Sequence, residues 1–130
     1  MTKIKNQLTL GSLFSGSGGF ELGGILAGIK PVWNSEIEPF VKLVTHKRFP
    51  KVMHYGDVSK LKGAELEPVD IVTWGSPCQD LSIAGKRAGL EGSRSGLYVQ
   101  AVRIVQEMLE ATNREYPKFC VFENVLCLLI

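Results

Sequence analysis

"LTLGSLFSGSGGFELGGILAGIKPVWNSE", residues 8–36, predicts a strand, a glycine-rich turn, a short helix and a second strand in succession. Apolar residues over 8–14 favour a buried strand, and the glycines of residues 15–19 interrupt it. Residues 20–29 predict the helix, and residues 31–36 the second strand. This succession is typical of a parallel sheet whose connecting helix lies on one face.

The rest of the chain continues this alternation. Apolar residues recur at helical spacing in two further segments, residues 38–49 and 96–113. Three more apolar runs have strand length, at residues 51–57, 70–75 and 118–124. The order predicts one doubly wound α/β domain with right-handed crossovers, in which ligands bind at the carboxyl ends of the strands.

Composition limits the class of protein. The chain has 130 residues, 45% hydrophobic and 22% charged, as expected of one soluble globular domain. It has no apolar run of about 18 residues and no signal-peptide core, so we expect a cytoplasmic protein without a membrane partner. A net charge of +2 does not by itself indicate nucleic-acid binding. Three widely spaced cysteines predict neither a disulfide framework nor a metal site.

The glycines after the first strand predict a ligand-binding loop, because they let the backbone approach a ligand closely. No Lys-Ser/Thr pair follows them, which excludes a phosphate P-loop. Glu36 lies at the end of the second strand, where a carboxylate can accept two ribose hydroxyls. NAD, FAD and S-adenosylmethionine all fit this pattern, and a plain packing turn remains an alternative. Asp57, after the third strand, fits either an adenine amino group or an ordinary turn.

Cys78 follows the fourth strand in "GSPCQDLS", residues 75–82, on a turn between Pro77 and Gln79. An accessible thiol near backbone amides there is a candidate nucleophile. The alternative is a small buried cysteine, which is the role we expect for Cys120 and Cys127 inside their apolar runs.

Glu123 and Asn124 are polar residues directly after the apolar run "FCVF". We expect the Glu123 carboxyl to be desolvated there, which would favour a protonated group that donates a hydrogen bond or acts as a general acid. A strand-end glutamate facing water is the alternative. The fourth and fifth strands should be neighbours, about 4.8 Å apart, which would place Cys78 and Glu123 in one crevice beside the glycine loop.

Together these motifs resemble those of the DNA (cytosine-5)-methyltransferases, in order and approximate spacing, over roughly residues 8–125. The segments concerned are LFSGSGGFELG, GD, GSPCQDLSIAGKRAGL, SGLYVQAVRIV and FENV. The resemblance implies a Rossmann-like parallel sheet of about five strands with flanking helices. It also implies S-adenosylmethionine as cofactor and double-stranded DNA with a flipped-out cytosine as partner.

The resemblance implies a role for each matched residue. Cofactor-binding residues would be Phe14, Gly16, Gly18, Gly19, Glu36, Ile37, Asp57, Val58 and Pro77. Glu36 would bind the ribose and Ile37 would pack on the adenine. Cys78 would attack cytosine C6 while Glu123 holds the N3/N4 edge, so that C5 accepts the methyl group. Residues facing the DNA would be Gln79, Ser82, Lys86, Arg87, Arg94 and Asn124.

Members of this family also have a target recognition domain and a late cofactor segment, for which this sequence has no match. We therefore expect residues 1–130 to form a partial catalytic domain that binds S-adenosylmethionine. An inactive remnant and one half of a split enzyme needing a second polypeptide are the alternatives, and restriction–modification is one of several roles that fit. A nicotinamide-dependent oxidoreductase would rest only on the glycines and Glu36, and would leave Cys78 and Glu123 unexplained.

Overall fold

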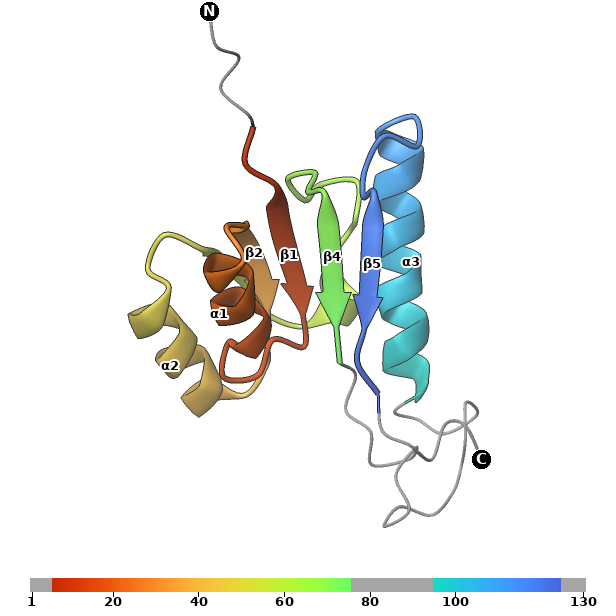
Figure 1. Ribbon diagram of the computed structural model, residues 1–130. Coiled ribbons are helices and arrows are strands. Elements are labelled where there is room, and N and C mark those ends of the chain that lie inside the picture. The colour runs from red at the N-terminus through yellow and green to blue at the C-terminus, as the bar shows by residue number, and fades with distance from the viewer. Residues whose placement is uncertain (1–5, 76–94, 125–130) are drawn as a thin grey trace, which may run out of the picture.

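The structure is a computed structural model that describes residues 6–75 and 95–124. Its centre is a 5-stranded parallel sheet in the order β3-β2-β1-β4-β5. Figure 1 shows β2, β1, β4 and β5 side by side in this order. The strands are β1 (Thr9–Leu13), β2 (Lys30–Ser35), β3 (Met53–Tyr55), β4 (Ile71–Trp74) and β5 (Phe119–Phe122). The prediction of a parallel α/β sheet with five strands is confirmed. Four strands are slightly shorter than their apolar runs, and β2 has the predicted length but begins one residue earlier.

Three helices connect the strands: α1 (Gly19–Leu26), α2 (Pro39–Arg48) and α3 (Ser95–Ala111). α1 lies on one face of the sheet, with α2 beside it, and α3 lies along the other side (Figure 1). One short 3-10 turn, η1 (Val58–Lys60), was not predicted, because three residues are too few to show a period. No helix in the described part of the chain is long and apolar enough to cross a membrane.

The main hydrophobic core lies between the sheet and α3. Leu13, Trp33 and Val72 from the sheet meet Ala101 and Ile104 of α3, and all are almost fully buried. A side chain at position 11 of β1 would collide with the Trp33 ring, so glycine is required there. The core therefore supports the same strands whose carboxyl ends carry the predicted site.

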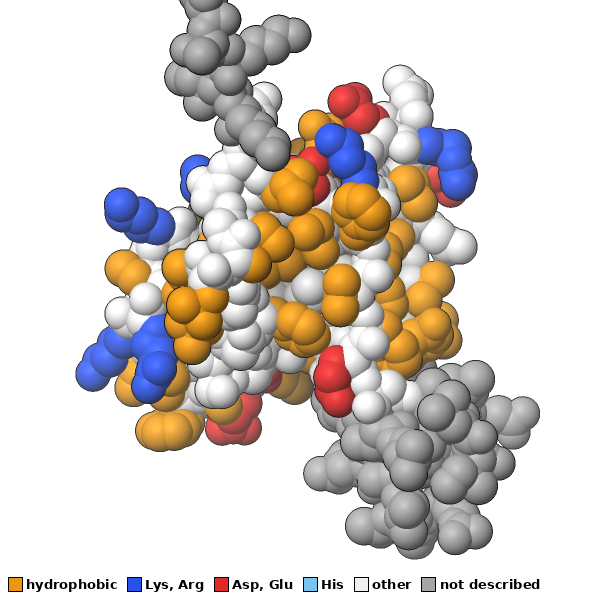
Figure 2. Space-filling view, viewed as in Figure 1, with side chains coloured by type: hydrophobic (Ala, Val, Ile, Leu, Met, Phe, Trp, Pro, Cys, Tyr) orange, Lys and Arg blue, Asp and Glu red, His pale blue; other side chains and the backbone are white. Residues whose placement is uncertain are grey.

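The α1 face of the sheet is different, because part of it is polar. Ser12, Asn34 and Thr73 lie side by side on β1, β2 and β4 and are all buried. Glu21 of α1 is fully buried over them, and its burial raises the pKa of the carboxyl. Further along this face, hydrophobic side chains are open to solvent over β4 and β5 (Figure 2).

β5 is the outermost strand of the described sheet and pairs on one side only, with β4. Its side chains are correspondingly open: Phe119 is 60% exposed and Val121 is 47% exposed. Cys120 is also exposed, so the prediction that it fills space in the core is wrong. Cys127, predicted in the same role, lies outside the described residues.

Candidate functional site

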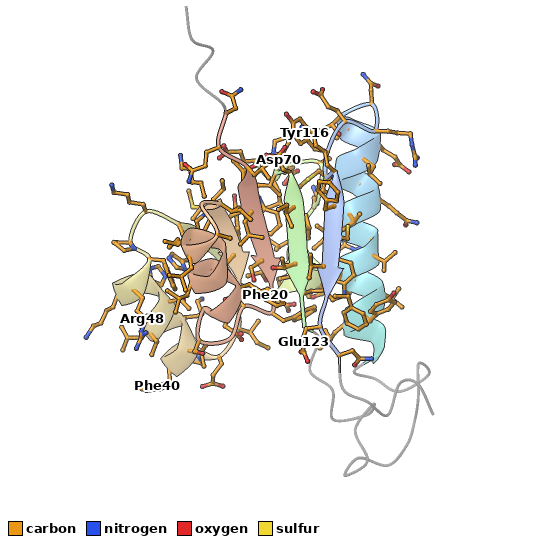
Figure 3. The ribbon with its side chains drawn as sticks, viewed as in Figure 1. Phe20, Phe40, Arg48, Asp70, Tyr116 and Glu123 are labelled. Atoms are coloured by element: carbon orange, nitrogen blue, oxygen red, sulfur yellow. The ribbon has the colours of Figure 1, made fainter. Side chains whose placement is uncertain are left out.

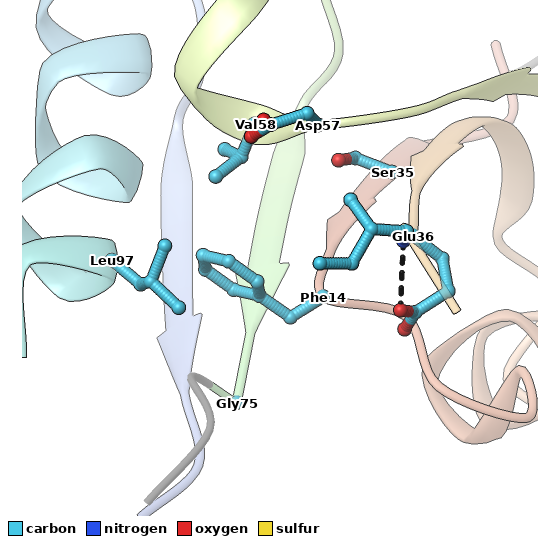
Figure 4. A pocket seen from close by; sticks show the side chains of 8 residues that line it. Phe14, Ser35, Glu36, Asp57, Val58, Gly75 and Leu97 are labelled. Carbon is cyan, nitrogen blue, oxygen red and sulfur yellow. Dashed lines mark hydrogen bonds between the residues drawn. The ribbon is translucent and has the colours of Figure 1, made fainter. Parts of the chain in front are cut away.

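A hollow of about 150 Å³ lies at the carboxyl ends of the strands. β1 is central here, because the chain continues to β2 on one side and returns to β4 on the other. In open α/β sheets this reversal of strand order opens a crevice for ligands. The residues that line the hollow are Phe14, Ser35, Glu36, Ile37, Asp57, Val58, Gly75 and Leu97 (Figure 4).

The glycine loop adjoins the hollow and is held in an unusual conformation. Phe14, directly after β1, has a positive φ of 53°, which is uncommon for a residue with a side chain. Gly16 and Gly18 have φ of 56° and 92°, in the left-handed region that favours glycine. The Ser15 amide donates to the Ser35 carbonyl at 3.0 Å, which fastens the loop to the end of β2. Strained backbone of this kind is found at functional sites.

Glu36 is the most heavily bonded side chain of the hollow. Its Oε2 accepts the backbone amide of Gly16 at 2.9 Å, and its Oε1 accepts those of Ile37 and Glu38 at 2.8 and 3.0 Å. Figure 4 shows the bond between Glu36 and Ile37. These donors fix the carboxylate, and an ionised carboxylate has further lone pairs for hydroxyl donors.

Asp57 and Val58 approach the hollow from the loop after β3. Asp57 Oδ1 accepts the Ser59 hydroxyl at 2.8 Å and the Ser59 amide at 2.9 Å, which caps η1. These two hydrogen bonds hold the pKa of Asp57 below its ordinary value, so the group is an acceptor at neutral pH. Val58 is buried, whereas Ile37 on the other side is 66% exposed and offers an apolar surface to a flat ring.

Glu123 lies at the carboxyl end of β5, and Asp70 lies at the opposite end of the strands (Figure 3). Its amide donates to the Trp74 carbonyl at 2.9 Å, which continues the parallel pairing of β4 and β5 that the sequence predicted. A Cβ added at Gly75 would lie 2.9 Å from Glu123 Oε2, so the carboxyl borders a residue of the hollow.

The environment of Glu123 corrects one prediction. We expected a desolvated carboxyl, but Glu123 is exposed in the structure. The physical reason is the position of β5 at the edge of the described sheet, where it pairs on one side only, with β4. The adjacent Asn124 is half-buried.

The structure brings together five of the predicted cofactor residues as lining residues, namely Phe14, Glu36, Ile37, Asp57 and Val58. Gly16, Gly18 and Gly19 form the adjoining loop and the first residue of α1. Seven predicted residues lie outside the described part of the chain: Pro77, Cys78, Gln79, Ser82, Lys86, Arg87 and Arg94.

Sequence reasoning missed three lining residues, namely Ser35, Gly75 and Leu97. The Ser35 hydroxyl donates to the Gly56 carbonyl at 2.7 Å, a contact between strand ends that no local pattern announces. Leu97 belongs to the apolar stripe of α3, and its period predicts burial without indicating a ligand.

A Rossmann-like sheet with a carboxylate and a glycine loop at its switch point is the arrangement typical of nucleotide-cofactor domains. The chain matches the family model of C-5 cytosine-specific DNA methylases over residues 8–129, and it belongs to that family. Family and fold together imply S-adenosylmethionine as the methyl donor.

Individual relatives carry the names of methyltransferases. The chain is 41% identical over 114 residues to the type II methyltransferase M2.BsuMI of Bacillus subtilis, covering 88% of this chain and 28% of that protein. It is 35% identical over 125 residues to a protein of Escherichia phage P1 named DNA N-6-adenine-methyltransferase, covering 92% of this chain and 17% of that protein. The chain thus spans less than a third of the length of either relative.

A solved structure also matches. It is described as a DNA modification methyltransferase encoded within an E. coli prophage, with 30% sequence identity and a TM-score of 0.74. The match covers 95% of this chain and 34% of that chain. The predicted Rossmann-like methyltransferase fold is therefore confirmed.

Proposed function

We propose that this chain forms the cofactor-binding part of a DNA (cytosine-5)-methyltransferase, which transfers a methyl group from S-adenosylmethionine to C5 of cytosine. The observation that carries the proposal is the convergence of Phe14, Glu36 and Asp57 on one hollow, with Glu123 at its border. Family membership supports the same reaction.

The residues of the hollow fit the parts of the proposed cofactor. The fixed carboxylate of Glu36 would accept the ribose hydroxyls. Ile37 would cover one face of the adenine, and the ionised Asp57 would accept its amino group. When bound, S-adenosylmethionine supplies an electrophilic methyl group on a sulfonium.

Cys78 and Glu123 are the proposed catalytic pair. The Cys78 thiolate would add to cytosine C6 while Glu123 protonates or holds N3, which turns C5 into an enamine carbon. C5 then takes the methyl group, loses its proton to a base, and expels the Cys78 thiolate as the C5–C6 double bond forms again. Gly75, three residues before Cys78, already lies against the Glu123 carboxyl.

DNA contacts are proposed for Gln79, Ser82, Lys86, Arg87, Arg94 and Asn124. The basic members would contact backbone phosphates, and the target base would leave the duplex stack to reach Cys78. An inactive remnant, or one half of an enzyme completed by a second polypeptide, remains the alternative for this chain by itself.

Methylation of adenine N6 is a second candidate, because the phage P1 relative carries that name. Transfer to an exocyclic amino group needs no cysteine adduct, so the two reactions differ in their dependence on Cys78. Mass spectrometry of DNA nucleosides after incubation with the enzyme separates 5-methylcytosine from N6-methyladenine.

The decisive experiment traps the cysteine adduct. The chain, alone and with the remainder of a related methyltransferase, is incubated with S-adenosylmethionine and DNA containing 5-fluorocytosine, whose C5 fluorine blocks release. We expect a covalent complex with the unsubstituted Cys78 and none with Cys78→Ser, while Cys120→Ser behaves as the unsubstituted chain. An adduct that persists in Cys78→Ser would refute the role of this residue.

A further inference from the structure

Two parts of the lining of the hollow come from distant segments of the chain. One part is Val58 of η1 with Asp57 before it, and the other is Leu97 near the start of α3. Figure 4 shows Val58 and Leu97 facing the same hollow from these different elements. A flat ring can contact Val58 and Leu97 at the same time only if other contacts fix the distance between η1 and α3.

Arg103 of α3 makes that connection through its guanidinium group. Its Nη2 donates to the Val58 carbonyl at 3.1 Å, and its Nη1 donates to the Leu61 carbonyl at 2.9 Å. These two acceptors are the first residue of η1 and the residue directly after it. A planar guanidinium that donates to both fixes the position of η1 and its orientation.

Arg103 is itself held by two neighbours on α3. Its Nε donates to Gln100 Oε1 at 2.7 Å, and its Nη1 donates to Glu107 Oε1 at 2.8 Å. The side chains of Arg103 and Glu107 are only 31% and 32% exposed, so this ion pair is shielded more than a surface pair. The guanidinium therefore has little freedom to leave η1.

Glu107 extends the connection beyond η1. Its Oε2 accepts the Gly63 amide at 2.6 Å. Partial burial alone would raise the pKa of Glu107, but Arg103 and the Gly63 amide lower it overall, so the carboxylate stays ionised. A Cβ at Gly63 would collide with the Ile104 carbonyl, which shows how closely this segment approaches α3.

We propose that Arg103, fixed by Glu107, is a positioning residue that holds Asp57 and Val58 at the distance from Leu97 that an adenine ring requires. This inference rests on the proposed cofactor site. Arg103 does not line the hollow, so it acts through η1 and not by contact with the cofactor. It sets the selectivity of the site for adenine as well as the affinity.

The effect of Arg103 on the position of η1 is tested without any ligand. Amide hydrogen exchange is measured on the full chain, on Arg103→Met and on a control, Lys62→Met, which removes the exposed surface pair with Glu65. We expect faster exchange in Arg103→Met at the amides of Ser59, Lys60, Leu61 and Gly63, whose acceptors depend on this geometry. Equal protection of these amides in the two variants would overturn the proposal.

The functional part is tested with two ligands, S-adenosylhomocysteine and its hypoxanthine counterpart, measured by calorimetry. We expect Arg103→Met to weaken binding of the adenine ligand by about tenfold. This is the effect of losing the proposed hydrogen bond from the adenine amino group to the charged Asp57 carboxylate. Its preference for adenine over hypoxanthine should fall toward parity. Arg103→Lys keeps the charge but loses the planar guanidinium. Its affinity for the adenine ligand should therefore lie between those of the unsubstituted chain and Arg103→Met.

Two results separate failure of this inference from failure of the proposed function. A lower melting temperature with an unchanged adenine preference would make Arg103 merely structural and overturn its positioning role. Binding of neither ligand by the unsubstituted chain would contradict the cofactor site and remove the adenine part of the inference. Hydrogen exchange would then still decide whether Arg103 braces η1.

Discussion

The backbone amide of Gly16 donates a hydrogen bond to Glu36 Oε2 at 2.9 Å, joining the glycine loop after β1 to the end of β2. A side chain expected only to bind a ribose therefore also shapes the loop beneath it. Loop geometry and ribose binding depend on one carboxylate, so a substitution at Glu36 should affect both.

Glu36→Ala should weaken binding of S-adenosylhomocysteine and also lower the stability of the fold by about 1–3 kcal/mol, because three backbone amides lose a charged acceptor. Glu36→Gln, which keeps one acceptor oxygen, should lose less of both. Calorimetry and urea unfolding measure the two effects. Glu38→Ala is the control, since the Glu38 side chain makes no capping hydrogen bond; equal losses at both positions would contradict this dual role.

The glycine at position 18 is expected to be irreplaceable for backbone reasons. Its φ is 92°, and an added Cβ would collide with the Phe49 ring. Gly18→Ala should therefore destabilise the fold by at least about 1–2 kcal/mol. Gly23→Ala is the matched substitution within α1, where an added Cβ meets nothing within 4 Å. It should stabilise by about 0.5–1 kcal/mol, and urea unfolding that ranked the two variants in the other order would refute this account.

The order of strands and helices could be predicted from the sequence because glycine turns and apolar periods are local signals. The convergence of Glu36 and Asp57 on one hollow followed from the rule for parallel sheets. Two hydrogen bonds could not be predicted, that between Gly16 and Glu36 and that between Arg103 and Val58. Each joins residues that are distant in sequence and produces no periodic pattern in the sequence.

Burial was the least predictable property. Cys120 and Glu123 were expected to be shielded because apolar residues surround them in sequence. Both are exposed, because shielding at an edge strand depends on what covers that edge and not on the strand's own residues. The exposed hydrophobic side chains of β5 have the same origin.

Stability should fall as the pH rises above the ordinary range of a glutamate carboxyl, because of Glu21. Burial raises the pKa of Glu21 in the fold, and interactions with its own backbone, Ser12 and Asn34 offset only part of the rise. The native state therefore keeps a proton that the unfolded chain releases, so the stabilisation is complete below the unfolded pKa and is lost as the pH rises through the folded pKa. Glu21→Gln should be more stable than the unsubstituted chain at pH 8, with a smaller difference at pH 4.

Urea unfolding midpoints measured from pH 4 to pH 8 check whether stability falls as the pH rises. Glu110→Gln is the control, because Glu110 is an exposed residue of α3. It should leave the pH dependence of the unsubstituted chain unchanged. A pH profile for Glu21→Gln parallel to that of the unsubstituted chain would show that this carboxyl does not titrate in the way its burial implies.

Gly75→Ala should impair chemistry while leaving the fold intact. The added methyl group would lie 2.9 Å from Glu123 Oε2, the mobile end of a side chain, so the carboxyl can move aside at little cost in stability. The melting temperature should stay close to that of the unsubstituted chain. Formation of the 5-fluorocytosine adduct should slow, because the displaced Glu123 carboxyl would no longer reach N3 of the cytosine. Gly56→Ala, where an added Cβ meets nothing within 4 Å, should change neither quantity. An unchanged adduct rate in Gly75→Ala would mean that the position of Glu123 against Gly75 is not the one used in catalysis.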